Sequence, residues 1–146
     1  MNSERYSKVV ANTVLLCNQY YNTKTFQHCL RVAKYTIDNV CLSSEDDQEI
    51  AFIVALCHDL LEDTAVSIEQ IAQATGFSTN FLSNVLGVLT RQESESYLEY
   101  IQRLKRNTSP YPYIVKLADM KDHLSQKDTL TEKLKEKYWE ALPELL

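Results

Sequence analysis

Glycine and proline are scarce in this chain, and their scarcity is what most constrains its fold. Only two glycines and three prolines occur among its 146 residues. Because these two residues most often stop helices and form tight turns, long stretches of the chain are free to stay helical. Leu, Glu, Lys, Gln and Ala, which favour helices, are abundant. The sequence therefore predicts an all-α fold, with about seven or eight helices in one bundle and a single domain over residues 1–146.

Apolar periodicity and capping residues predict where these helices lie. Ser67 is followed three residues later by Gln70, which is the spacing of a capping box. Pro110 and Pro112 mark a break before the next helix, since proline is tolerated in a first helical turn. The expected helices cover 6–21, "FQHCLRVAKYTIDNV", the stretch from "SSEDDQEI" to about residue 61, "SIEQIAQATG", "STNFLSNVLGVLT", "SESYLEYIQRLKRN", "YIVKLADMKDHL" and "TEKLKEKYWEALPELL".

Charge, apolar runs and cysteine spacing narrow the class of protein. The formal net charge of -5 gives no electrostatic reason to expect nucleic acid or a membrane surface as a partner. No apolar run approaches the roughly 18 residues of a membrane span, and the N-terminal residues lack the apolar core of a signal peptide. We therefore expect a cytoplasmic protein with reduced cysteines, since no CxxC pair occurs among Cys17, Cys29, Cys41 and Cys57.

The stretch "ALCHDLLEDT" is the first candidate for a functional site. It places His58, Asp59, Glu62 and Asp63 directly after an apolar run that should be buried. Buried charge is costly without a compensating partner, and a divalent metal ion is one such partner. On a helix, residues four apart share a face, which would pair His58 with Glu62 and Asp59 with Asp63.

Two further residues could complete a metal site with this stretch. His28 lies among apolar residues of an earlier helix, and Asp119 interrupts the apolar run "YIVKLAD" of a later one. Taken singly, His28 is better explained as a core histidine bonded to a carbonyl, and Asp119 as a polar helix position. Together with His58 and Asp59 they supply two imidazoles and two carboxylates, a donor set suited to Mn²⁺, Fe, Co or Zn. Four protein ligands would leave octahedral positions for water and substrate, as in catalytic sites.

The order of these residues resembles that of the HD-domain metal-dependent phosphohydrolases. "HDLLEDT" is similar to the His-Asp-x-x-Glu-Asp-Thr string of the stringent-response alarmone hydrolases, which remove the 3'-pyrophosphate of (p)ppGpp. The resemblance runs in one order over nearly the whole chain. It includes "HCLRVA", "LTRQESESYLEYIQR", "VKLADMKDHL" and "KYWEAL".

The resemblance implies an HD-domain fold and a role for each motif residue. One divalent ion, with Mn²⁺ as first candidate, would be bound by His28, His58, Asp59 and Asp119. Glu62 and Asp63 would be the catalytic carboxylates that handle the attacking water, chemistry suited to a carboxylate near a metal ion. The substrate contacts implied or suggested by position are Lys24, Lys116, His123 and Tyr138. Arg91 is a further candidate for a phosphate contact.

Two departures from the alarmone hydrolases lie on the substrate side. The stretch "NQYYNTKTFQH" has neither glycine nor proline and offers only Lys24 as a cation, where that family has a basic-rich loop. His123 stands where the family usually has asparagine. The leading prediction is hydrolysis of (p)ppGpp to GDP or GTP and pyrophosphate. One alternative is a nucleotidase or pyrophosphohydrolase for another nucleotide, and another is a non-catalytic module that binds metal or nucleotide. A helical interaction domain, in which the motif only stabilises the fold, also stays open.

Overall fold

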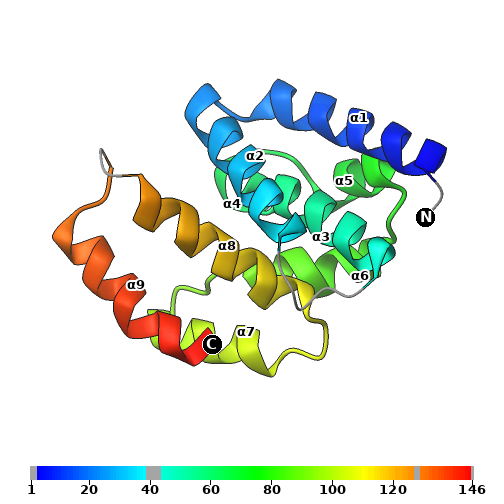
Figure 1. The fold of residues 1–146 in the computed structure, drawn as a ribbon. Coiled ribbons are helices and arrows are strands. Elements are labelled where there is room, and N and C mark those ends of the chain that lie inside the picture. The colour runs from blue at the N-terminus through cyan, green and yellow to red at the C-terminus, as the bar shows by residue number, and fades with distance from the viewer. Residues whose placement is uncertain (1–2, 39–43, 127–128, 146) are drawn as a thin grey trace.

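A computed structural model describes residues 3–38, 44–126 and 129–145. These residues form helices joined by turns, with no strand among them, so the all-α prediction is confirmed for the described part of the chain (Figure 1). Cys41, one of the four cysteines, lies outside the described residues. The elements are α1 Ser3–Tyr20, α2 Thr23–Ile37, α3 Glu45–Cys57, α4 Leu60–Asp63, α5 Ile68–Thr75, α6 Thr79–Leu82, the π-helical turn η1 Ser83–Gly87, α7 Tyr97–Arg106, α8 Tyr111–Ser125 and α9 Glu132–Leu145.

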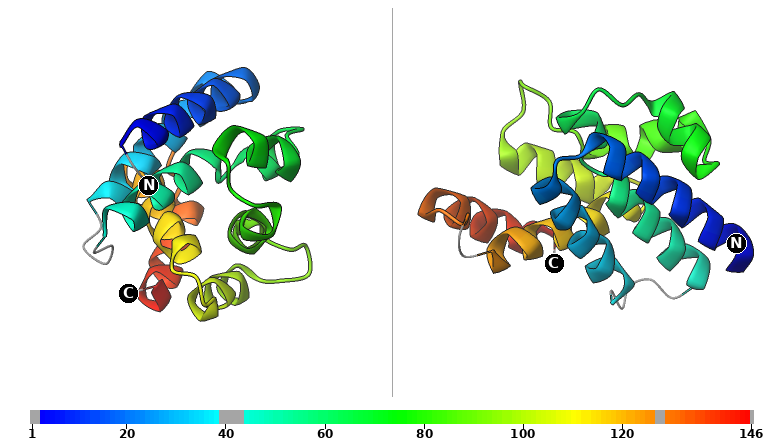
Figure 2. Two further views of the ribbon diagram at one scale, coloured as in Figure 1. Left: turned by 90° about the vertical axis from the view of Figure 1, so that its right-hand side faces the viewer. Right: turned by 90° about the horizontal axis from the view of Figure 1, so that it is seen from above.

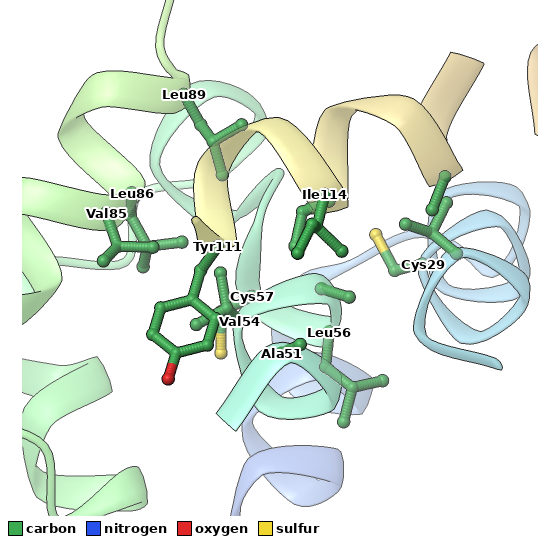
Figure 3. Close-up of a cluster of buried hydrophobic side chains, with 14 of the residues drawn as sticks. Cys29, Ala51, Val54, Leu56, Cys57, Val85, Leu86, Leu89, Tyr111 and Ile114 are labelled. Atoms are coloured by element: carbon green, nitrogen blue, oxygen red, sulfur yellow. The ribbon is translucent and has the colours of Figure 1, made fainter. Parts of the chain in front are cut away.

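Helices α2, α3 and α8 form the centre of the molecule, where α2 packs against both of the others. Helices α1 and α5 contact each other on one side, and α7 and α9 pack together on the opposite side (Figures 1 and 2). The segment 53–57 of α3 is buried all round, because neighbours cover every face of it. Figure 3 shows the apolar cluster in which α3 meets Cys29 of α2 and Ile114 of α8. This packing brings residues that are distant in the sequence, such as His28 of α2 and Asp119 of α8, side by side.

Local capping explains where several helices begin. Ser44 accepts a hydrogen bond from the backbone N–H of Asp47 and caps α3, whose first turn is acidic, as the positive end of a helix favours. The predicted capping box of Ser67 and Gln70 is present at α5, and a second one joins Ser96 to Glu99 at α7. Helix α8 has proline in its first turn, as predicted. None of the helices in the described ranges is both long and apolar enough to cross a bilayer.

The third helix ends earlier than the sequence predicts. We expected it to continue to about Leu61, but α3 stops at Cys57 and α4 begins at Leu60. The carbonyl oxygen of Ala55 explains the break. It accepts from the backbone N–H of His58 at 3.3 Å and from Nδ1 of the His58 ring at 2.6 Å, in place of the next α-helical bond. His58 and Asp59 therefore lie between two helices, and the expected pairing of positions along one continuous helix face does not apply to them.

Candidate metal centre

Three separate parts of the chain bring the predicted metal ligands together. His28 comes from α2, His58 and Asp59 from the break after α3, and Asp119 from α8. Oδ1 of Asp119 lies 2.8 Å from Nε2 of His28 and 3.3 Å from Nε2 of His58. Oδ2 of Asp59 lies 3.3 Å from Nε2 of His58 and 3.7 Å from Nε2 of His28. The donor atoms of His28, His58 and Asp119 lie within 4.8 Å of one another, close enough to share one small cation, and Asp59 belongs to a second such group with Cys29 and His58.

The second ring nitrogen of each imidazole is held by a group that can only accept a hydrogen bond. Nδ1 of His28 donates to Oδ2 of Asp122 at 2.7 Å, and Nδ1 of His58 donates to the Ala55 carbonyl oxygen at 2.6 Å. Both neutral rings would then turn an Nε2 lone pair toward the Asp119 carboxylate, so that acceptors face acceptors. A proton on each ring or a shared metal ion would relieve this repulsion. Metal-binding histidines are typically oriented in this way by a carboxylate or a carbonyl, so the residues fit a divalent ion.

The pKa shifts at the cluster reflect the same demand for positive charge. Burial alone lowers the pKa of His58, yet Asp59 and the hydrogen bond with Asp119 raise it well above its usual value. Burial also lowers the pKa of His28, but its bonds with Asp119 and Asp122 outweigh this and raise it. Burial would raise the pKa of Asp119, but neighbouring cations hold it well below the ordinary range. The cluster thus favours positive charge, which either protonated imidazole rings or a metal ion would supply.

Asp119 is also the point at which the predicted substrate residues meet the cluster. Nζ of Lys116 donates to Oδ2 of Asp119 at 2.8 Å, and Nε2 of His123 lies 3.3 Å from Oδ1. The His123 ring stacks on Tyr138 of α9, with ring centroids 5.5 Å apart and planes 8° apart. Three of the four predicted substrate residues therefore lie beside the predicted metal ligands.

The fourth, Lys24, is placed differently. It is exposed near the start of α2, one turn before His28. In the described part of the chain it makes no hydrogen bond or ion pair with the cluster.

Glu62 and Asp63, the predicted catalytic carboxylates, lie at the rim of the cluster on α4. Both side chains are exposed. Oε1 of Glu62 accepts a hydrogen bond from the backbone N–H of Arg91 at 3.2 Å, which ties α4 to the loop before α7. Desolvation and the nearby Asp59 carboxylate raise the pKa of both residues. They stand within reach of the ligands without forming part of the buried group.

Asp122, Arg31 and Cys29 are site residues that the sequence interpretation missed. Asp122 is 1% exposed and, besides holding His28, accepts from Nε of Arg31 at 2.7 Å and from Nη2 at 3.1 Å. The spacing offered a signal, because Arg31 follows His28 by three residues and Asp122 follows Asp119 by three, so each pair shares a helix face. Sγ of Cys29, which is buried, lies 3.7 Å from Oδ2 of Asp59 and joins a second possible donor group with His58.

Comparison with known families gives no match to any family model, and comparison with curated proteins gives no match either.

Proposed function

We propose that this protein is a metal-dependent phosphohydrolase of phosphorylated nucleotides, with an HD-type domain and (p)ppGpp as the first candidate substrate. One observation carries the proposal. Two imidazoles, each with Nδ1 bonded to an acceptor, direct Nε2 at the same carboxylate oxygen of Asp119. Such an arrangement needs a cation, and its mixed nitrogen and oxygen donors suit a first-row divalent metal.

His28, His58, Asp59 and Asp119 would hold the ion, for which Mn²⁺ is the first candidate and Fe, Co or Zn are alternatives. When bound, a divalent ion supplies Lewis-acid polarisation of a phosphoryl oxygen and activates water for attack. Asp122 and the Ala55 carbonyl oxygen fix the orientations of the two imidazole rings through their Nδ1 atoms.

The remaining steps fall to side chains at the rim. Glu62, with Asp63 beside it, would orient the attacking water and accept its proton. Lys116, held on Asp119, would present positive charge to the phosphoryl group. The stacked rings of His123 and Tyr138 would contact the nucleotide.

A different nucleotide is the second candidate for the substrate. The observation favouring it is the position of Lys24, which is exposed and lies outside the cluster, so the basic contact expected before His28 for an alarmone is lacking in the described residues. The metal chemistry would be unchanged, and only the base and ribose contacts would differ. A cytoplasmic location with reduced thiols belongs to the same proposal. Cys17, Cys29 and Cys57 are free thiols.

The test is a nucleotide panel with one matched pair of variants. Purified protein would be incubated with Mn²⁺ and ppGpp, GTP, GDP, dNTPs or monophosphates, and released phosphate and pyrophosphate would be measured. Asp59→Ala should lose metal and activity while its circular dichroism spectrum stays helical. Asp38→Ala, which removes an exposed carboxylate from the end of α2, should change neither.

Each outcome has a distinct meaning. Mn²⁺-dependent conversion of ppGpp to GDP would support the first candidate, and turnover of another nucleotide alone would support the second. Stoichiometric metal without turnover of any nucleotide would contradict the hydrolase proposal and favour a metal- or nucleotide-binding module. If Asp59→Ala unfolded and the wild-type protein bound no metal, a purely structural role for the motif would follow.

A further inference from the structure

We infer that Arg91 and Lys137, gathered around the ring of Tyr97, form a second anion subsite that binds a phosphate group of the substrate other than the one hydrolysed. The role of this subsite in binding substrate rests on the proposed function. Neither Arg91 nor Lys137 is among the proposed metal ligands.

Three cations converge on the aromatic ring of Tyr97. Nζ of Lys137 lies 4.3 Å from the ring centroid of Tyr97, Nζ of Lys116 lies 5.6 Å away and Cζ of Arg91 5.9 Å away. All three fall within the roughly 6 Å at which a cation meets the negative face of an aromatic ring. They come from α9, from α8 and from the loop before α7. The subsite is therefore built by tertiary packing of α9 beside α7 and α8 (Figure 1).

The positive charge around Tyr97 is only partly neutralised. Lys116 is paired with Asp119. Neither Arg91 nor Lys137 has a carboxylate within ion-pair distance in the described part of the chain. Nε of Arg91 donates instead to the backbone carbonyl of Glu95, whose carboxylate is taken by Arg103. Partial burial, together with repulsion from Lys116 and Arg91, lowers the pKa of Lys137, as expected where like charges crowd together. In a chain of net charge -5, such a cluster is suited to an anion.

The subsite also adjoins the metal centre. Lys116, which faces the Tyr97 ring, donates to the proposed metal ligand Asp119. The ring of Tyr138 lies 5.3 Å from Nζ of Lys137 and stacks on His123. A ligand with one phosphate group at the metal could therefore place another over Tyr97. Arg and Lys together suit phosphate, because guanidinium and ammonium groups both form charge-assisted hydrogen bonds with its oxygens. The substrate class that follows is a nucleotide with more than one phosphate group.

Direct binding to metal-free protein tests the subsite apart from catalysis. The protein would be treated with chelator and titrated calorimetrically with inorganic pyrophosphate, GDP and guanosine at low ionic strength. Pyrophosphate and GDP should bind and guanosine should not, because the phosphate supplies the attraction. Lys137→Gln and Arg91→Gln should each weaken binding about tenfold, a loss typical of one charge-assisted contact. Added salt should weaken binding further.

Lys135→Gln is the matched control, since it removes the same charge from an exposed position on the same helix. It should leave pyrophosphate binding unchanged. Thermal unfolding of Lys137→Gln should differ little from that of the wild type, because loss of the contacts with the Tyr97 and Tyr138 rings is offset by relief of repulsion from Lys116 and Arg91. Equal losses for Lys135→Gln and Lys137→Gln, or no saturable binding of pyrophosphate, would overturn the inference. Failure of the hydrolase proposal would be distinguishable, because turnover would then be absent while pyrophosphate still bound and the variants still weakened that binding.

Discussion

Asp122 accepts a hydrogen bond from Nδ1 of His28 across 94 positions of sequence, with 2.7 Å between the two atoms. Because Asp122 is buried and also clamped by Arg31, its carboxylate fixes the orientation of the His28 ring. The ring in turn points Nε2 at Asp119, 2.8 Å away. Asp122, which is not one of the proposed metal ligands, thus orients the proposed ligand His28.

Asp122→Asn should weaken metal binding by about 10- to 100-fold, the range usual for partners that orient metal-binding histidines. The amide cannot accept as strongly from His28 Nδ1–H, so the ring loses its fixed tautomer and some basicity. Mn²⁺ affinity would be measured by competition with a chelating dye. Arg31→Gln is the matched variant, because it removes a partner of Asp122 yet keeps the bond to His28, and it should have a smaller effect. Equal metal affinity in Asp122→Asn and wild type would contradict the orienting role.

Cys29 should influence which metal the site prefers. Its thiol sulfur lies 3.7 Å from Oδ2 of Asp59, and it shares a possible donor group with Asp59 and His58. Thiolates favour soft or borderline ions such as Cd²⁺ and Zn²⁺ over Mn²⁺. Cys29→Ser should therefore lower the affinity for Cd²⁺ and Zn²⁺ clearly more than the affinity for Mn²⁺, in the same competition assay. Cys17 is a buried cysteine whose thiol donates to the Leu56 carbonyl oxygen, and Cys17→Ser should leave all of these affinities unchanged. A uniform loss across the metals would argue against a sulfur donor.

Tyr97→Phe should leave the free energy of unfolding unchanged or raise it slightly. The Tyr97 hydroxyl is buried and, although Lys116 lies near it, makes no hydrogen bond of normal geometry in the described part of the protein, so the wild type already bears much of the cost of its desolvation. Tyr100→Phe is the matched comparison on the same helix. Its hydroxyl donates to the Leu89 carbonyl oxygen, and its removal should cost about 1 kcal/mol. Urea unfolding of both variants would check this, and a large loss in Tyr97→Phe would show that its hydroxyl has a partner after all.

The ion pair between Glu95 and Arg103 should make stability depend on pH in the acid range. The Arg103 guanidinium, 2.6 Å from Oε1, lowers the pKa of Glu95 from 4.5 to about 2. The folded state therefore binds the proton less readily than the unfolded state. The contribution is complete above the unfolded pKa and is lost as the pH falls through the folded one. The difference in urea midpoint between wild type and Glu95→Gln should shrink from pH 4.5 to about pH 2. A difference that stays constant over this range would rule out the pair as its source.

Much of the fold could be predicted from the sequence because the signals for helices are local. Few glycines, apolar periodicity and serine caps act over one or two turns, so the all-α class and the capping box at Ser67 followed directly. The break after Cys57 could not be predicted in this way. It depends on the His58 ring competing for the Ala55 carbonyl, which apolar periodicity does not reveal.

Part of the candidate site could likewise be predicted from the sequence, and part could not. Residue type and order alone pointed to His28, His58, Asp59 and Asp119, since imidazole and carboxylate are the groups that bind divalent metals. Only the tertiary structure decided that Asp122 holds His28 and that Lys137 joins Arg91 over Tyr97. The physical reason is that these contacts join residues on different helices. Their distances are set by how α2, α8 and α9 pack, and no pattern within a single helix encodes that packing.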